Sequence, residues 1–293
     1  MCQRVFTSVF GFSCWAVAAR YFVAQWKAEQ NLATQLAAPQ AAIEIKFVGL
    51  FDTVSSVGYG LGFGSNVQEL GLDLGGVPKK VVHLTAANEY RKNFALTTID
   101  SSLGVGGGFE CKLPGVHSDI GGGYAELEDE VRNVRLYHRD ILIEQGWYLD
   151  GTNGTDNQIP ILNDTWAVGR RLIPLHYQFI TLAIMLELAD KSDVKFKSLE
   201  GKFLNYVIPP KLKPVADYLM GEVRMQKTEV TLPPEHAWVR NAYLHRSAHT
   251  YRAKLDSPKR IKRDKLNGVA FAGREVNKEF QREVFPDNKP QSA

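Results

Sequence analysis

Three side chains in this sequence have the types that acyl transfer requires. They are Ser13, Asp52 and His117, and each follows a segment whose composition predicts a β-strand. A serine hydroxyl is a poor nucleophile until a neutral imidazole takes its proton. The imidazole in turn needs a buried carboxylate that holds its tautomer and stabilises the imidazolium. The three residues could therefore form a nucleophile, an acid and a base, if the fold brings them together.

His117 lies in the most distinctive stretch of the chain, Pro114–Tyr124, which contains three consecutive glycines from Gly121 to Gly123. A glycine costs roughly 0.5–1 kcal/mol when it is ordered in a regular element. Gly121 and Gly122 therefore indicate backbone that bends sharply or approaches another group closely. Asp119 is expected to orient this loop, and a metal ligand through the His117-x-Asp119 spacing is the alternative. A strand-to-helix turn with a surface histidine would also fit the pattern.

Ser13 lies between a predicted strand, Arg4–Phe10, and an apolar helix of about 18 residues that includes Ala16. A strand, Gly-x-Ser and a helix are the layout of a nucleophile elbow, in which a strained turn lifts the serine clear of the sheet. The backbone N–H of Cys14 would then form half of an oxyanion hole. Trp15 occupies the last glycine position of the full G-x-S-x-G motif, so the match is partial, and a Gly-x-Ser triplet without function is the alternative.

Asp52 follows Ile43–Phe51, which alternates at first and then becomes fully apolar, as expected of a strand buried on both faces. Open α/β sheets keep their chemistry at the carboxyl ends of such strands. An aspartate that caps the next turn is the simpler interpretation. The chain order of nucleophile, acid and histidine is that of the α/β-hydrolase fold.

The remaining chain predicts an α/β fold of the α/β-hydrolase type, with a mostly parallel sheet, flanking helices and a helical C-terminal region. Residues 1–150 are expected to form the catalytic core, and residues 151–293 a helical and basic region packed on it. Further strands are expected at Val81–Leu84 and Phe109–Leu113, and helices at Ala86–Phe94, Leu127–Gln145 and Leu172–Ala189.

Composition excludes several classes of function. The 293 residues carry a formal net charge of +3, which is too small to indicate nucleic-acid binding. Basic residues gather between Arg240 and Lys265, as on a solvated face or a surface for anionic lipid. The three cysteines lack zinc-site or disulfide spacing, and no apolar run reaches the length of a membrane span. His245, four residues before His249, is the reserve candidate for the base.

Four blocks resemble one family, the catalytic domain of class-one type VI secretion lipase effectors. Phe10–Ser13 with Ala18-Ala19-Arg20 and Phe22 is similar to the family's elbow, F-G-F-S-R-G-A…A-x-R-x-F, and Val48–Val54 to its F-x-G-x-F-D-T-V strand. Glu89-x-Arg91-x-x-Phe94 matches a helix of the family, and Pro114–Tyr124 is the most specific block. The resemblance covers residues 4–150 well.

The resemblance implies a triad of Ser13, Asp52 and His117, no cofactor or metal, and a phospholipase that a type VI system injects from the producer's cytoplasm into a competitor. The implied partners are phospholipid membranes, a secretion spike and immunity proteins. Arg4, the apolar residues up to Trp15 and Ala16-Val17-Ala18 would also fit a signal peptide, but its cleavage would remove Ser13.

Two departures from the family pattern raise an alternative. A bulky Trp15 at the elbow is expected to cost roughly 1–3 kcal/mol in strain. The chain also begins about one strand before Ser13, where the family has several strands, including the loop thought to supply the second oxyanion donor. Loss of one such donor costs about 10²–10³ in turnover. The alternative is therefore an impaired, truncated remnant that binds lipid or a partner without turning it over.

Overall fold

The computed structural model describes residues 5–35, 43–55, 71–91, 94–151, 157–196, 206–247 and 282–287. Its main sheet contains four parallel strands in the order β1-β2-β3-β5. These strands are β1 (Val5–Phe12), β2 (Ile43–Phe51), β3 (Lys80–Ala86) and β5 (Gly108–Leu113). The predicted α/β class is confirmed, and β2 has the bounds expected from its apolar pattern.

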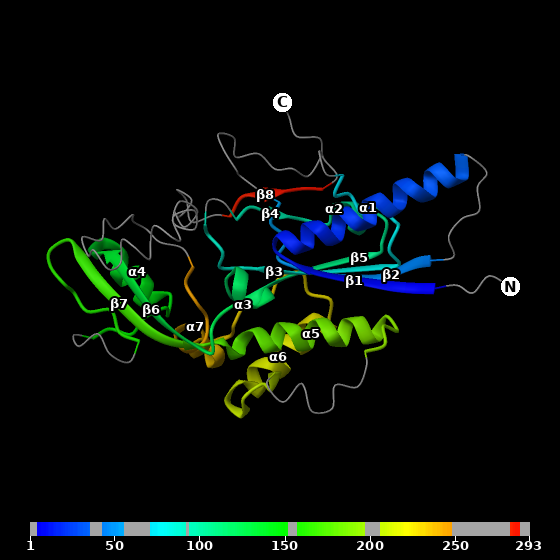
Figure 1. The fold of residues 1–293 in the computed structure, drawn as a ribbon. Coiled ribbons are helices and arrows are strands. Elements are labelled where there is room, and N and C mark those ends of the chain that lie inside the picture. The colour runs from blue at the N-terminus through cyan, green and yellow to red at the C-terminus, as the bar shows by residue number, and fades with distance from the viewer. Residues whose placement is uncertain are drawn as a thin grey trace.

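Helices cover both faces of this sheet (Figure 1). Helix α1 (Cys14–Gln35) packs on β1 and β2 from one side, and α5 (Gln178–Lys191) packs on β2 and β3 from the other, with α6 (Lys213–Arg224) against α5. Because both faces are covered, the central strands are apolar throughout, and the residues of β3 from Val81 to Ala86 are all buried.

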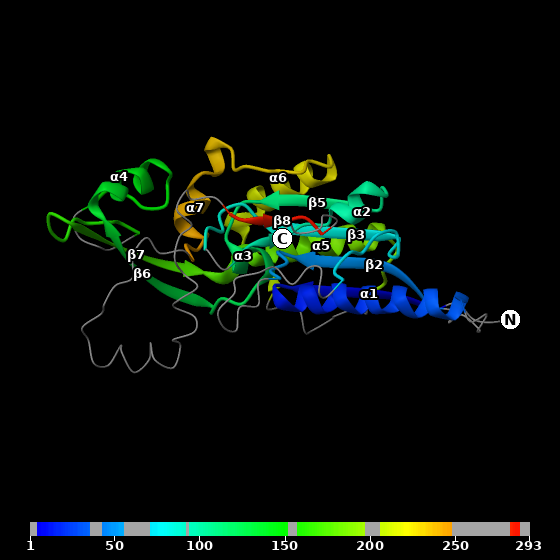
Figure 2. The ribbon, with the colours of Figure 1, turned by 90° about the horizontal axis from the view of Figure 1, so that it is seen from above.

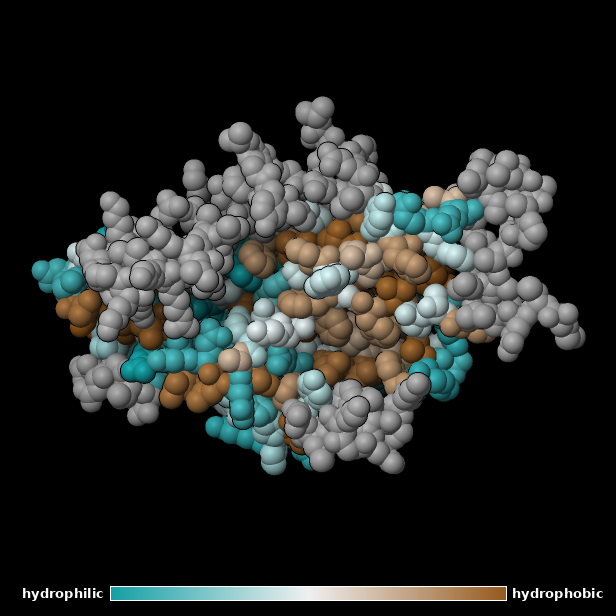
Figure 3. Space-filling view, viewed as in Figure 1, coloured by the Kyte–Doolittle hydropathy of each residue, from teal (hydrophilic) through white to brown (hydrophobic). Residues whose placement is uncertain are grey.

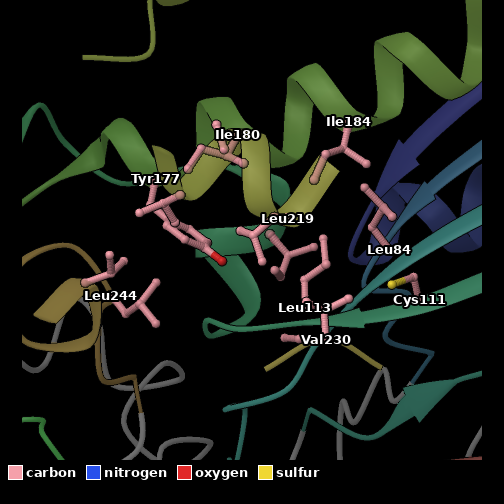
Figure 4. Packing of buried hydrophobic residues seen from close by; sticks show 14 of the residues in the cluster. Leu84, Cys111, Leu113, Tyr177, Ile180, Ile184, Leu219, Val230 and Leu244 are labelled. Carbon is pink, nitrogen blue, oxygen red and sulfur yellow. The ribbon is translucent and has the colours of Figure 1, made fainter. Parts of the chain in front are cut away.

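The larger core lies between β3, β5 and the helices α5 and α6 (Figure 4). Leu84 and Leu113 of the sheet meet Ile180 and Ile184 of α5 and Leu219 of α6 in this layer. A second cluster, which includes Ala16, Val48 and Val81, lies under α1. These two layers fix the sheet between its helices and so hold the carboxyl ends of the strands in place.

Two smaller sheets flank the main one. An antiparallel pair, β6 (Leu127–Arg135) and β7 (Trp166–Pro174), extends as a ribbon beyond one end of the main sheet (Figures 1 and 2). The short strands β4 (Leu96–Thr97) and β8 (Val284–Phe285) pair in parallel. The short helices are α2 (Asp100–Gly104), α3 (His117–Gly121), α4 (Leu136–Glu144), η1 (Leu175–Tyr177), η3 (Pro210–Leu212), η4 (Pro234–His236) and α7 (Trp238–Ala242).

Three predicted helices are wrong in whole or part. The Leu127–Gln145 segment forms β6 and then α4, because Glu130 of β6 turns inward to a buried ion pair with Arg171 of β7. In Leu172–Ala189, β7 continues to Pro174 and α5 begins only at Gln178. The helix expected at Ala86–Phe94 is a loop in its described part, where the side chain of Glu89 folds back onto Arg91.

By composition, Leu172–Ala189 and the late basic residues could together dock on a membrane, and the structure contradicts this expectation for the helical part of that segment. The apolar residues of α5 are buried in the core, among them Phe179, Ile184 and Leu188. Arg246, part of the late basic run, is buried as well, whereas the run from Arg252 to Lys265 lies outside the described residues. Among the described helices, none has the length and hydropathy that a membrane crossing requires.

Candidate active site

Ser13 occupies the turn between β1 and α1 with φ of +56°, a left-handed backbone conformation that residues other than glycine rarely adopt. The turn is so tight that it leaves no room for a side chain at Gly11, since a Cβ there would lie only 2.5 Å from the carbonyl oxygen of Trp15. The strained strand–turn–helix geometry of an elbow is therefore present. The strain expected from packing the bulky Trp15 ring at the elbow is avoided, since the ring is 77% exposed.

Ser13 and Asp52 follow neighbouring strands at the same height. Phe12, the last residue of β1, is in register with Phe51, the last residue of β2. The backbone N–H of Ser13 donates to the carbonyl of Phe51 at 3.1 Å. Asp52 also has a positive φ, of +43°, and its own N–H donates to Leu84 of β3. The carboxyl edge of the sheet thus brings the turn that bears Ser13 beside the residue that bears the carboxylate.

His117 reaches the same edge from the first turn of α3. Its Nδ1 lies 2.6 Å from Oδ2 of Asp52, and both side chains are buried. The ring of Phe12, the residue before Ser13, lies 4.5 Å from the imidazole between centroids. The ring of Phe94 also contacts the imidazole, edge-on, at 5.0 Å between centroids. His117 therefore contacts Asp52 directly, whereas its contact with the turn that bears Ser13 runs through the ring of Phe12.

The charge on Asp52 fixes the tautomer of His117. Burial opposes the charged carboxylate, but Arg282 and His117 together hold the pKa of Asp52 far below its ordinary value. An ionised carboxylate can only accept hydrogen bonds, so Nδ1 of His117 must donate. In the neutral imidazole the lone pair is then on Nε2, which is the atom a general base uses.

The glycine-rich loop shapes the approach to His117. A Cβ on Gly121 would overlap the ring of Phe12, so the close approach expected at these glycines is present. Gly115, Gly122 and Gly123 have φ of +122°, +91° and +116°, which confirms the expected sharp bends. The three glycines with positive φ let the loop bend sharply, and Gly121 lets it pass against the ring of Phe12.

Asp119 hydrogen-bonds within the loop and to His245. Its Oδ2 accepts from the backbone N–H groups of Val116 and His245, and its Oδ1 lies 2.7 Å from Nδ1 of His245. His245, the reserve candidate for the base, is thus paired with Asp119 and stacked on Tyr124. The described residues contain no group of three or more His, Cys, Asp or Glu side chains that could hold a metal ion.

Sequence reasoning missed three residues that support the site. Nε2 of His83, on β3, accepts from the N–H of Thr53 beside Asp52, while its Nδ1 donates to Glu110. Glu89 is buried and accepts from the N–H of His117 at 3.3 Å. Arg282 binds both oxygens of Asp52. Of these three residues, only Glu89 belongs to one of the sequence blocks that resemble the family.

A parallel sheet with helices on both faces, an elbow serine and an Asp–His pair at its carboxyl edge are the features of an α/β-hydrolase-like domain. Residues 9–141 match the family model "T6SS, Phospholipase effector Tle1-like, catalytic domain". This part of the chain is therefore a Tle1-like catalytic domain, and the resemblance expected from the sequence is confirmed for it.

A solved structure supports the fold. The structure of "the Tle1 effector bound to the VgrG spike from the Type 6 secretion system" is similar with a TM-score of 0.66 at 22% identity, and the match covers 97% of this chain and 67% of that one. An uncharacterized protein from Pseudomonas aeruginosa matches at 21% identity over 80% of this chain and 30% of its own, with a TM-score of 0.42. No curated protein sequence matches the chain significantly.

Proposed function

We propose that this chain is a serine hydrolase that cleaves acyl esters of phospholipids through Ser13, His117 and Asp52. The observation that carries the proposal is the 2.6 Å contact between His117 and an ionised Asp52 at the sheet edge where Ser13 occupies a strained elbow. The family model that matches residues 9–141 is that of a phospholipase effector, which supports the choice of substrate.

In the proposed reaction, Oγ of Ser13 attacks the ester carbonyl carbon while Nε2 of His117 takes the hydroxyl proton. Asp52 stabilises the imidazolium that forms. The imidazolium then returns the proton to the leaving alcohol oxygen as the ester bond breaks, which leaves an acyl group on Ser13. A water molecule gives a proton to Nε2 of His117 as its oxygen attacks the acyl-enzyme. The imidazolium then returns this proton to Oγ of Ser13 as the acyl–oxygen bond breaks, which releases the fatty acid and the free serine.

The backbone N–H of Cys14 supports the oxyanion in this scheme. Cys14 is the first residue of α1, and the first N–H groups of a helix have no acceptor within the helix. The N-terminus of a helix also carries a partial positive charge, which favours a developing oxyanion. We propose Cys14 as one donor of the oxyanion hole.

Apolar side chains around the elbow support a lipid substrate. Trp15, Tyr21 and Phe22 of α1 are exposed, as are Phe6 and Phe10 of β1. Brown, hydrophobic residues gather on the face where Figure 1 shows β1 and α1 (Figure 3). An apolar surface beside the nucleophile suits acyl chains better than a small polar ester.

Hydrolysis of phospholipid vesicles tests the proposal. The wild-type chain, Ser13→Ala and His117→Ala are compared for released fatty acid, with a short-chain ester as the second substrate. Wild type is expected to release fatty acid, and each variant to lose about 10⁴-fold or more in rate. Turnover of the short ester alone would indicate a different esterase. A folded chain that binds vesicles without turnover would favour the binding-module alternative.

A VgrG spike is the carrier that we propose for this chain, because the similar Tle1 effector is bound to one. Secretion by a type VI system would follow from this partnership. Retention of the purified, labelled chain on an immobilised VgrG spike, and loss of that retention when unlabelled chain competes, tests this partner. A chain that never associates with the spike of its own secretion system would contradict it.

A further inference from the structure

Arg282 places a guanidinium group on the carboxylate of Asp52, 230 residues away in the chain. Its Nη1 donates to Oδ1 at 2.6 Å and its Nη2 donates to Oδ2 at 2.8 Å. The arginine side chain is only 9% exposed, so water screens the pair little. This is the two-pronged geometry that gives the strongest arginine–carboxylate contacts.

The guanidinium and the imidazole share one oxygen of Asp52. Oδ2 accepts from Nδ1 of His117 and from Arg282, whereas Oδ1 accepts from Arg282 and from the N–H of Ala86. A cation at this distance offsets much of the carboxylate's negative charge. Asp52 therefore attracts a proton on His117 less strongly than it would without Arg282.

The segment that carries Arg282 is fastened independently of this ion pair. Two residues after Arg282, β8 pairs with β4, and the backbone N–H of Leu96 donates to the carbonyl of Glu283. At the far end, Asp287 forms a fully buried ion pair with Arg20 and accepts two hydrogen bonds from Ser101. Loss of the charge on Arg282 should therefore leave the segment docked.

We propose that Arg282 is a positioning residue of the hydrolytic site, which fixes the orientation of Asp52 and offsets part of the carboxylate's charge at its hydrogen bond to His117. The proposal rests on the function proposed above. It assigns to the segment at 282–287 a part in the site that the matched residues 9–141 do not include.

Other charged groups face this site but do not duplicate the role of Arg282. Glu89 accepts from the N–H of His117, and its charge is matched by Arg91, with Ser247 as a further donor. Two further titratable pairs lie on elements packed against the site, His83 with Glu110 and Asp119 with His245. Among the described residues, Arg282 is the only arginine or lysine whose side chain hydrogen-bonds to Asp52.

The test is an NMR titration of the His117 imidazole in the full chain, assigned with His117→Gln and repeated in Arg282→Gln. Removal of the guanidinium is expected to raise the titration midpoint by on the order of one pH unit. The acid limb of the ester-hydrolysis profile should move in the same direction. Arg170→Gln is the matched control, because Arg170 makes a similar two-pronged contact with Asp129 on the surface. It should leave the midpoint unchanged.

A folded Arg282→Gln with the wild-type midpoint would overturn the proposal. If that variant does not fold, Arg282→Lys decides, because an ammonium keeps the charge but cannot make the two-pronged contact. Release of Oδ2 should then move the Nδ1 proton resonance of His117 downfield, and an unchanged resonance would overturn the proposal. The titration needs no turnover, so a shifted midpoint in a chain that hydrolyses nothing would support the role of Arg282 and contradict only the proposed hydrolysis.

Discussion

The ring of Phe12 fills the space that a side chain on Gly121 would occupy. Phe12 is the last residue of β1, directly before Ser13, and Gly121 is the last residue of α3, the helix that begins with His117. The same ring packs 4.5 Å from the imidazole. The elbow and the helix that bears the candidate base are therefore held together through one aromatic contact.

Gly121→Ala is expected to separate these two elements. The added methyl overlaps the Phe12 ring, so the ring or α3 must move, at a cost of typically 1–3 kcal/mol in unfolding free energy. A displacement of about 1 Å at the base should lower ester hydrolysis by on the order of 10²-fold. Urea unfolding and initial rates measure the two effects.

Gly221→Ala is the control for this substitution. Nothing lies within 4 Å of a Cβ at Gly221, which is in the last turn of α6. Alanine there should stabilise the helix by up to about 1 kcal/mol and leave the rate unchanged.

The double variant Phe12→Leu/Gly121→Ala should recover part of the stability that Gly121→Ala loses. Equal effects of the two glycine substitutions would contradict the role of the Phe12 contact.

Acid stability should depend on Glu130 of β6. Burial opposes its charge, but Arg171 and Arg132 outweigh burial and lower its pKa to about 2 from an ordinary 4.5. The unfolded chain therefore binds the proton first as the pH falls. The stabilisation from this shift, about 3 kcal/mol, is complete above pH 4.5 and is lost as the pH falls toward 2.

Urea unfolding of Glu130→Gln between pH 7 and pH 3 tests this effect. At neutral pH the variant should be less stable by roughly 3–5 kcal/mol, because the buried Arg171 loses its partner. The difference in unfolding free energy between the variant and wild type should become smaller below pH 4.5. Glu128→Gln, on the same strand, should show a small gap at every pH. A gap for Glu130→Gln that does not change with pH would be inconsistent with the ion pair.

His245→Gln should separate the two histidine–aspartate pairs. His245 belongs to Asp119 and supports the loop, whereas His117 belongs to Asp52. The variant should lose about 1–3 kcal/mol of stability, because a buried carboxylate loses a donor. Its rate should remain within about tenfold of wild type, against about 10⁴ for His117→Ala. Comparable losses in two folded variants would reopen the assignment of the base.

The amino acid sequence was most informative where local patterns alone determine structure. The apolar run of β2 and the glycines after His117 predicted a buried strand and sharp bends, and both are present. The fold of β6 could not be predicted in this way, because its charged residues have a helical pattern. Only the partner Arg171, 41 residues later, makes a strand of that segment favourable.

The residue types of the site could be predicted from the sequence, but the contacts between these residues could not. Asp52 and His117 each follow a strand, and their direct contact depends on the strand order, which no short window encodes. Arg282 lies 230 residues from Asp52 without any surrounding motif. The helix predicted around Glu89 is a loop because this buried carboxylate binds Arg91 and the N–H of His117.

Trp15→Ala should distinguish contact with a lipid surface from a structural role. Because the ring is exposed, its removal should change the unfolding free energy by less than about 0.5 kcal/mol. Hydrolysis of a soluble short-chain ester should be unchanged, while hydrolysis of vesicles should fall severalfold as apolar contact with the bilayer is lost. Tyr137→Ala, an equally exposed aromatic on α4, is the control. Parallel losses on both substrates would contradict a lipid-contact role.

The most direct test of the account is covalent labelling of the folded chain with a fluorophosphonate, followed by peptide mass spectrometry. A serine activated by the His117–Asp52 pair should form a single phosphonyl adduct, on Ser13, and His117→Ala should abolish it. An adduct on another residue, or a folded wild-type chain that resists labelling, would contradict the claim that Ser13, His117 and Asp52 act together.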